Sequence, residues 1–326
     1  MNSIDYLKEI SISDIPGVSI AHAQDDEAKT GVSVIYFKDG AQAGCDISGG
    51  GPASRETPLT SSMTADNPLN AIVLSGGSAF GLAAGDGVMR CLEDNDIGFD
   101  TGFSKVPLVC QSCIFDLGYG KKDVRPDADM GYLACSRALE KCDESIGNVG
   151  AGTGASVGKL CGMKQAMKSG LGIHAVQIGE LKVAAVVVVN AFGDIFDATD
   201  SHKLAGMVTP DRKEFLDVEQ TFIQMMNTPK DLFHTNTTIG CVITNAKFDK
   251  AKLNKIASMT RSAYSRCINP VATLADGDSI YAASVGDVAC DVNVAGTLGA
   301  KVMQEAIKKA VVSAHIDDEE FLKYCL

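Results

Sequence analysis

The chain has 326 residues, of which 45% are apolar or aromatic (AVILMFWYC) and 33 are glycine. This composition is typical of a packed globular protein with many tight turns, and it excludes a disordered chain. The net charge is −12, and the Lys and Arg residues are scattered along the sequence. A surface that follows nucleic-acid phosphates needs a basic stripe, so we expect no nucleic-acid partner.

The sequence also bears on compartment and cofactors. The start, MNSIDYLKEISISDIPG, lacks the basic head and apolar run of a secretory signal. The longest apolar run, 183–192, is half of the ~20 residues that a membrane-spanning helix needs. We therefore expect a soluble, cytoplasmic protein that binds no membrane, and reduced thiols at its eleven Cys.

Cys110 and Cys113 have the CxxC spacing of a metal or redox motif. A zinc site would need a second such pair or nearby His, and the sequence places neither beside it. We interpret these Cys as small apolar core residues, and we expect neither a metal nor a cofactor.

The N-terminal third is predicted to be mainly sheet. Residues 31–47 are interpreted as two strands joined by a hairpin turn at Asp39-Gly40. The apolar run 71–77 indicates a strand covered on both faces, and a helix is expected to open at Ser78. A second helix is expected after Arg125-Pro126, because proline suits the first turn of a helix.

The rest of the chain alternates buried strands with helices. Three strands are predicted at 183–197, 237–246 and 279–287, and two amphipathic helices at 212–226 and 291–312. Such doubly buried strands need helices or another sheet on each face, which gives a mixed α/β (α+β) fold. No linker divides the chain, so we expect one domain, 1–326, with 199–236 as its most exposed and cleavable region.

The glycine-rich stretch 147–160 invites comparison with a phosphate-binding P-loop. Such a loop needs Gly, four residues, Gly-Lys and then Ser or Thr. Here Thr153 stands at the first glycine position and Leu160 follows Lys159, so the motif fails twice. Lys159 is either a surface lysine after a tight turn or a side chain that faces a site. The glycine-rich stretches 48–57 and 75–81 leave the same choice between turns and walls of a site.

Three polar residues, Asn236, Thr237 and Thr238, introduce the strand predicted at 237–246. They match a glycosylation sequon, which a cytoplasmic chain would not use. They also suit a turn, or the start of a strand. A chemical interpretation stays open as well: cleavage of the 236–237 bond would give Thr237 a free α-amino group with a pKa of roughly 7.7–8.0, next to its own hydroxyl.

Several longer stretches resemble one known family. They are IPGVSIAHA, GGGPASRETPL, AIVLSGGSAFGL, FDLGYG, VRPDADMGY, GNVGAGTGASVGKL, VVVNAFGDIFD, NTTIGCVIT and DGDSIYAASVGD. In this order they resemble the self-processing aminopeptidases that include L-aminopeptidase/D-esterases, β-peptidyl aminopeptidases and the nylon-oligomer endo-hydrolase. The Asn-Thr and Asp-Gly-Asp stretches are most similar to the nylon-oligomer hydrolase type, whereas β-aminopeptidases use serine as the nucleophile.

The resemblance implies roles for individual residues. Asn236–Thr237 would be the autocleavage bond and Thr237 the nucleophile. Asp276 and Asp278 would hold and tune the amine and hydroxyl of Thr237. Two more residues are implied to be catalytic: Lys159, as a cation near the nucleophile, and Asn190, as an amide donor to the oxyanion. Asn148 and Tyr119 lie in matching segments, but the resemblance gives them no role here. Without it, the two aspartates would be a turn and Asn190 a satisfied core residue.

The family fold that the resemblance implies is a four-layer αββα sandwich with buried mixed sheets. Cleavage would give a large subunit, 1–236, and a small subunit, 237–326, that stay associated because the small one could not form its own core. We expect an amidohydrolase, an aminopeptidase on small peptides or amides, assembled as a homo-oligomer of processed heterodimers. An acyltransferase of the ornithine-acetyltransferase kind and a non-catalytic binding protein remain alternatives.

Overall fold

The structure is a computed structural model that describes residues 7–226 and 236–326. Within these residues, ten strands form two layers that share the long strand β3 (Thr30–Ile47). The first layer has the order β1 (Lys8–Ile10), β11 (Leu171–Ile178), β12 (Leu181–Asn190), β15 (Thr237–Ala246), β17 (Ser279–Val288) and β3. The second contains β2 (Val18–Asp25), β3, β5 (Leu69–Ser75), β8 (Val109–Cys113) and β4 (Ala53–Arg55).

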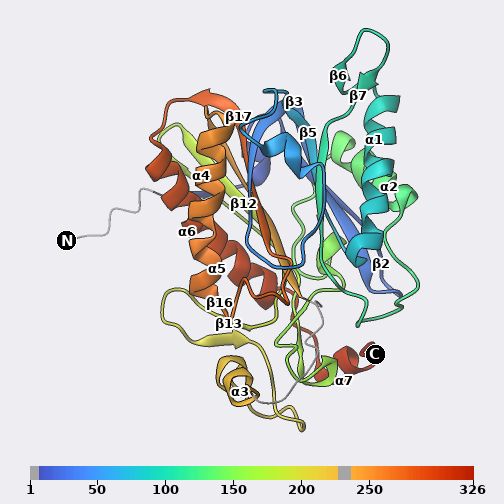
Figure 1. Cartoon of the computed structure of the whole chain (residues 1–326), viewed down its shortest axis with the longest axis vertical. Helices are drawn as coiled ribbons and strands as arrows, with labels where there is room; N and C mark the ends of the chain where they lie inside the picture. The colour runs from blue at the N-terminus through green and yellow to red at the C-terminus, as the bar shows by residue number, and fades with distance from the viewer. Residues whose placement is uncertain (1–6, 227–235) are drawn as a thin grey trace, which may run out of the picture.

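Helices cover the outer face of each layer, so the chain has the four-layer αββα arrangement (Figure 1). One apolar core lies between the two strand layers and contains side chains from both. A second core joins the first layer to α4 (Lys250–Thr260), α5 (Ser262–Cys267) and α6 (Val292–Val312). A third joins the second layer to α1 (Ala84–Asp94) and α2 (Ala128–Glu140). The predicted fold class is confirmed.

Strand pairing brings three chain segments to one edge of the first layer. β12 and β15 run antiparallel, so the end of β12 lies beside the start of β15. β15 and β17 run parallel, so both strands begin at that same edge. The polar residues that precede β15 and β17 are therefore neighbours in space although 40 residues separate Thr238 from Asp278 along the chain.

Shorter elements surround this edge. They are β9 (Ser156–Val157), β10 (Met167–Lys168), β13 (Asp194–Phe196), β14 (Lys203–Ala205), β16 (Ile268–Asn269), α3 (Val218–Gln224) and α7 (Asp318–Leu322). At the opposite end of the molecule, β6 (Phe99–Asp100) and β7 (Lys105–Val106) form a projecting hairpin (Figure 1). None of the helices in the described parts of the chain is both long enough and apolar enough to cross a membrane.

The hairpin predicted at Asp39-Gly40 is wrong, because β3 continues through both residues. Gly40 has a left-handed φ of +78°, and the pairing of β3 with β5 shifts register between Tyr36 and Ala41. A glycine in this conformation bends the strand as it passes from one layer to the other.

Two helix starts also differ from the prediction. The segment that opens at Ser78 is first a 3-10 helix, and α1 begins only at Ala84. The helix expected over 212–226 begins at Val218, where the Asp217 carboxylate caps it by accepting the Gln220 N–H at 2.8 Å.

The predicted exposed region, 199–236, is wrong in part. Residues 205–208, from the end of β14 onward, are buried, and Met207 packs in an apolar cluster with Leu160 and Phe192. Asn236 is also buried, at 3% exposure. Residues 227–235 lie outside the described residues.

Candidate active site

Thr237 is the first residue of β15, in the middle of the first layer between β12 and β17. Its register partner is Asn190, the last residue of β12. Thr237 is 4% exposed and Asn190 is fully buried. The structure therefore brings the predicted nucleophile and the predicted asparagine side by side at the edge where the strands begin.

The peptide bond before Thr237 has two donors at its carbonyl. The Gly277 N–H donates to the Asn236 carbonyl oxygen at 2.9 Å, and the Thr237 hydroxyl also donates to that oxygen. A side chain on residue 277 would place its Cβ 2.9 Å from Thr237 Oγ1 and 2.8 Å from the Gly51 carbonyl oxygen. Glycine is thus required at 277 for the backbone to reach this carbonyl.

Asp278 holds the backbone on either side of the site. Its carboxylate accepts the Thr238 N–H at 2.6 Å and the Ala272 N–H at 3.1 Å. Burial raises the pKa of Asp278 to about 8, and the nearby Asp276 carboxylate adds to the rise. The Asp276 carboxylate in the Asp-Gly-Asp stretch therefore disfavours the ionisation of Asp278.

Asp276 organises the turn that leads into β17. Its carboxylate accepts the Thr273 hydroxyl at 2.6 Å and the Thr273 N–H at 3.0 Å. It also accepts the Phe192 N–H at 3.3 Å, which ties it to the end of β12. Burial raises the pKa of Asp276, whereas these hydrogen bonds and the Lys159 charge oppose the rise.

Lys159 reaches the same place from the glycine-rich loop. Gly158 has a left-handed φ of +71°, and a Cβ there would lie 2.1 Å from the Met207 nitrogen, so only glycine fits before the lysine. Lys159 is buried, and its Nζ donates to the Asn190 backbone oxygen at 3.0 Å and to Asn190 Oδ1 at 2.8 Å. The lysine faces the site and is not a surface side chain.

Burial lowers the pKa of Lys159 to about 7, although three carboxylates (Asp276, Asp116 and Asp278) act to raise it. An amine with this pKa is partly neutral at pH 7, when it can accept a proton. The resemblance implies a cation here, whereas the burial of Lys159 favours a group that changes its charge near neutral pH.

Both the oxygen and the nitrogen of the Asn190 side-chain amide form hydrogen bonds with neighbouring residues. Its Oδ1 accepts from Lys159 Nζ and from the Ser156 N–H at 3.1 Å, and its Nδ2 donates to the Phe115 carbonyl oxygen at 2.9 Å. Both donors at Oδ1 fix the orientation of the amide. To donate to an oxyanion, Nδ2 would have to leave Phe115, so this geometry supports a role in positioning Lys159.

Asp116 was not singled out from the sequence, although it lies in the matching FDLGYG stretch. Its carboxylate accepts the Thr30 hydroxyl at 2.6 Å and the Gly77 N–H at 2.7 Å, and burial raises its pKa. Gly77 belongs to the glycine-rich stretch 75–81, so the backbone of this stretch holds the Asp116 carboxylate in place. Gly277 was given no role of its own either; both residues lie in stretches that match the family, which was the signal that could have pointed to them.

The other glycine-rich stretch, 48–57, packs against the turn before β17. The N–H groups of Ser48 and Gly49 donate to the Asp278 carbonyl oxygen at 3.0 and 3.2 Å, and the Gly51 N–H donates to the Asp276 carbonyl oxygen at 2.9 Å. The sequence left open whether the stretches 48–57 and 75–81 are turns or walls of a site. In the structure, backbone N–H groups of both stretches donate hydrogen bonds to residues of the candidate site.

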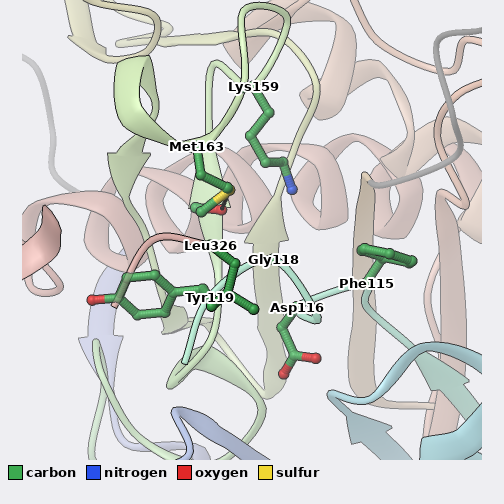
Figure 2. Close-up of a pocket in the computed structure, with 9 residues that line it drawn as sticks. Phe115, Asp116, Gly118, Tyr119, Lys159, Met163 and Leu326 are labelled. Carbon is green, nitrogen blue, oxygen red and sulfur yellow. Dashed lines mark hydrogen bonds between the residues drawn. The ribbon is translucent and has the colours of Figure 1, made fainter. Parts of the chain in front are cut away.

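A pocket of about 250 Å³ opens beside Lys159 (Figure 2). Lys159 points toward its centre, with Tyr119 and Met163 on one side and Phe115 on the opposite side. Its lining consists of Phe115, Asp116, Gly118, Tyr119, Ser156, Lys159, Gly162, Met163 and Leu326. Tyr119 thus belongs to the pocket wall, whereas the Asn148 amide donates to the Ala314 carbonyl oxygen at 3.2 Å and holds the segment after α6.

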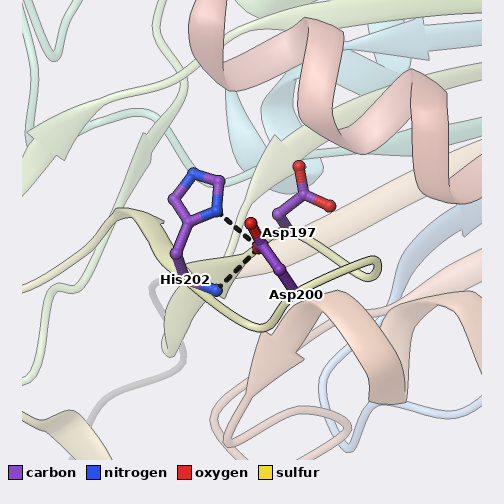
Figure 3. A group of neighbouring side chains, drawn as sticks. All are labelled: Asp197, Asp200 and His202. Carbon is purple, nitrogen blue, oxygen red and sulfur yellow. Dashed lines mark hydrogen bonds and ion pairs between the residues drawn. The ribbon is translucent and has the colours of Figure 1, made fainter.

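Among the described residues, one group of side chains has the spacing of a metal site: Asp197, Asp200 and His202 (Figure 3). Its members already have partners. Asp200 accepts from the backbone and ring of His202 at 3.1 and 2.6 Å, and Asp197 forms an ion pair with Lys308 at 2.6 Å. We interpret this group as a turn that is held by hydrogen bonds between Asp200 and His202. The CxxC residues, Cys110 and Cys113, lie three apart on strand β8, so their thiols point to opposite faces.

A family model described as peptidase family S58 matches residues 11–318. The chain belongs to peptidase family S58. An S58 chain is a hydrolase that acts on amide bonds, and the resemblance inferred from the sequence motifs is confirmed.

Relatives within and near the family agree with this assignment. The chain is 35% identical over 296 residues to an uncharacterised aminopeptidase of Mycobacterium leprae (strain TN), a match that covers 85% of this chain and 79% of the relative. It is 29% identical over 319 residues to the 6-aminohexanoate-oligomer endohydrolase of Kocuria sp. (strain KY2), covering 91% and 84%. Both relatives are named for the hydrolysis of amide bonds.

The fold is shared with a solved structure. The L-aminopeptidase D-Ala-esterase/amidase of Ochrobactrum anthropi, described as a variant of the Ntn hydrolase fold, superposes with a TM-score of 0.63 at 15% identity. The superposition covers 96% of this chain and 93% of that one. The S58 chain therefore has this hydrolase fold over nearly its whole length.

Proposed function

We propose that this S58 chain is an N-terminal-threonine amidohydrolase. It cleaves its own Asn236–Thr237 bond and then acts as an aminopeptidase on short or unusual peptides and amides, through an acyl-enzyme on Thr237. One observation carries the proposal: the Thr237 hydroxyl lies at the carbonyl of the preceding bond, and the Gly277 N–H polarises that same carbonyl.

Self-cleavage follows from these contacts. Thr237 Oγ1 bonds to the Asn236 carbonyl carbon and gives up its proton, and the Gly277 N–H stabilises the negative oxygen that forms. The carbon–nitrogen bond then breaks, the proton passes to the Thr237 nitrogen, and an ester remains on the hydroxyl. Water hydrolyses the ester, which releases the Asn236 carboxylate and restores the hydroxyl.

The first step needs a base other than the Thr237 nitrogen, because that nitrogen is still part of an amide. Lys159 fits this role, since it is held against the register partner of Thr237 and its pKa is lowered to about 7. Asn190 positions this amine through Oδ1. Asp276 and Asp278 fix the backbone around the bond and set the charge that Lys159 experiences.

After cleavage the same hydroxyl serves the substrate. The freed Thr237 amine, with an unperturbed pKa of roughly 7.7–8.0, becomes a second base beside it. The substrate acyl group forms an ester with Oγ1, the amine product leaves with a proton, and water completes hydrolysis. The fragments 1–236 and 237–326 remain one folded unit because β15 lies inside the first layer. We also propose that processed units assemble as a homo-oligomer in the cytoplasm.

A denaturing gel and an amidase assay test this function together. Wild-type protein should give two bands, of 236 and 90 residues (326 − 236 = 90), and should hydrolyse aminoacyl p-nitroanilides. Thr237→Ala should remain full-length and inactive. Thr238→Ala is the matched control, because it removes the neighbouring buried hydroxyl and keeps the N–H that Asp278 accepts.

Two results would contradict the proposal. A processed, active Thr237→Ala protein would remove Thr237 from both roles. Ornithine-dependent acetyl exchange without any p-nitroanilide hydrolysis would favour the acyltransferase.

A further inference from the structure

We infer that the C-terminal segment 318–326 forms a wall of the substrate pocket, and that the Leu326 side chain limits the size of the apolar acyl group accepted there. This inference rests on the proposed amidohydrolase function, because it assigns the pocket beside Lys159 to the acyl part of the amide. Residues 319–326 lie beyond the part of the chain that the family model matches.

The segment is fixed to the pocket by backbone hydrogen bonds. The Gly120 N–H donates to the Tyr324 carbonyl oxygen at 2.8 Å, and the Leu326 N–H donates to the Gly118 carbonyl oxygen at 3.1 Å. These bonds pair the segment antiparallel with residues 118–120, where Tyr119 faces Cys325. Leu326 is thereby placed against the same short stretch that supplies Gly118 and Tyr119 to the pocket lining.

Side chains anchor the segment one turn earlier. Phe321 is 1% exposed, and its ring stacks on Tyr119 with centroids 5.1 Å apart. Asp318 forms an ion pair with Arg212 at 2.7 Å, and the Arg212 guanidinium lies over the Phe321 ring, 5.3 Å from its centroid. These contacts hold the segment in a defined position without the Leu326 side chain. Leu326 itself is 64% exposed.

The residues that line the pocket indicate which kind of substrate group it would bind. Four apolar or aromatic side chains line it: Phe115, Tyr119, Met163 and Leu326. Its carboxylate, Asp116, is already held by Thr30 and Gly77. Thr237 does not itself line the pocket; Lys159, which points toward the pocket centre (Figure 2), connects the two because it contacts Asn190, the register partner of Thr237. An acyl group carried on Thr237 would therefore enter at the lysine end, and its apolar chain would extend toward Leu326.

Substitution at 326 should therefore change substrate preference and leave self-cleavage intact. We would measure kcat/KM of the processed enzyme for alanyl, leucyl and phenylalanyl p-nitroanilides. Leu326→Ala should raise the phenylalanyl-to-alanyl ratio about tenfold or more, and Leu326→Trp should lower it by a similar factor, as expected for small volume changes in an apolar pocket. The matched control is Leu322→Ala, in α7 but outside the pocket lining.

The outcomes separate this inference from the function on which it rests. If both Leu326 variants keep the wild-type ratio within twofold, as the control should, the inference is wrong while the amidohydrolase function stands. If wild-type enzyme hydrolyses none of these or other aminoacyl amides, the proposed function and the inference fail together. If the Leu326 variants change self-cleavage in the same proportion as all three kcat/KM values, the segment has a structural role only.

Discussion

Two buried lysines, Lys159 and Lys168, lie nine positions apart and differ in what surrounds them. Lys168 Nζ donates to three backbone carbonyls, of Gly152, Ala155 and Ser169. Lys159 Nζ contacts Asn190, which lies next to Thr237 in the strand pairing. The first arrangement holds a loop together, whereas the second attaches an amine to the residue that pairs with Thr237.

The charges around the two lysines differ in the same way. Burial lowers the pKa of both lysines; at Lys168 the Lys29 charge adds to the fall, and the Asp116 carboxylate opposes it. Lys159 instead lies near three carboxylates that oppose the fall and leave its pKa at about 7. Burial alone therefore does not indicate catalysis; what distinguishes Lys159 is its contact with Asn190, the register partner of Thr237, together with the carboxylates around it.

Replacing Lys159 should produce the largest effect. Lys159→Met should slow self-cleavage by a factor of about 100 to 10,000, because the base for the first step is lost. The free energy of unfolding should also fall by about 1–3 kcal/mol, because two buried oxygens of Asn190 lose a donor, so cleavage is scored on the folded fraction. Lys159→Arg should not restore cleavage, because a guanidinium stays protonated. Cleavage would be followed on denaturing gels; normal cleavage in Lys159→Met would contradict the proposed base.

The Gly277 N–H is the proposed donor to the oxyanion, so a substitution at 277 tests whether a backbone group contributes to self-cleavage. Gly277→Ala should slow self-cleavage about 10- to 1,000-fold, because its Cβ would push the N–H away from the Asn236 carbonyl. Gly179→Ala is the control, since it replaces a distant glycine that has open space around it and a left-handed φ of +56°, and so reports the backbone strain of a glycine substitution alone. Equal cleavage rates in both variants, measured by intact mass over time, would remove the Gly277 N–H from the mechanism.

The pH dependence of self-cleavage tests the charge of Lys159. The neutral amine is the active form, so the rate should rise about tenfold per pH unit below the pKa of about 7 and level off above it. The apparent pKa belongs to Lys159 together with the two aspartates. Precursor isolated at pH 5.5 and transferred to buffers between pH 6 and 9 would give the profile; a rate that falls across this range would indicate a required cation.

Replacing Lys168 should have a smaller effect, on stability instead of cleavage. Lys168→Met leaves its carbonyl partners buried without a donor, and we expect the free energy of unfolding to fall by about 1–3 kcal/mol. The folded fraction should still cleave itself. Denaturant titration beside a gel would check both; a stable Lys168→Met protein that cannot cleave would place Lys168 in the catalytic machinery.

The sequence predicts the fold well where a strand is one continuous apolar run. The apolar run 183–189 located β12, although the strand predicted over 183–197 ends at Asn190 and β13 follows as a separate strand. The strand predicted at 237–246 coincides with β15. β3 was predicted wrongly because Asp39-Gly40 has the residues of a hairpin turn, whereas here Gly40 bends a strand that continues. Local residue types cannot distinguish a turn from a bend when the partner strands are unknown.

Some residues of the candidate site could likewise be predicted from the sequence, and others could not. Thr237 and the Asp-Gly-Asp stretch could be found from the sequence, because the chemistry of a freed threonine and the family motifs both point to them. The contacts of Gly277 and Asp116 could not be found, since they depend on the parallel pairing of β15 with β17 and on the packing of separate glycine-rich loops. The partners of Asn190 could not be predicted from the sequence either, and they favour a positioning role over the predicted role as donor.

Intact-mass measurement of purified wild-type protein, with N-terminal sequencing of any small fragment, tests the central claim most directly. The account predicts two masses, for 1–236 and 237–326, and a fragment whose first residue is Thr237. A single full-length mass that persists through long incubation at pH 8, or a fragment that begins at another residue, would contradict it.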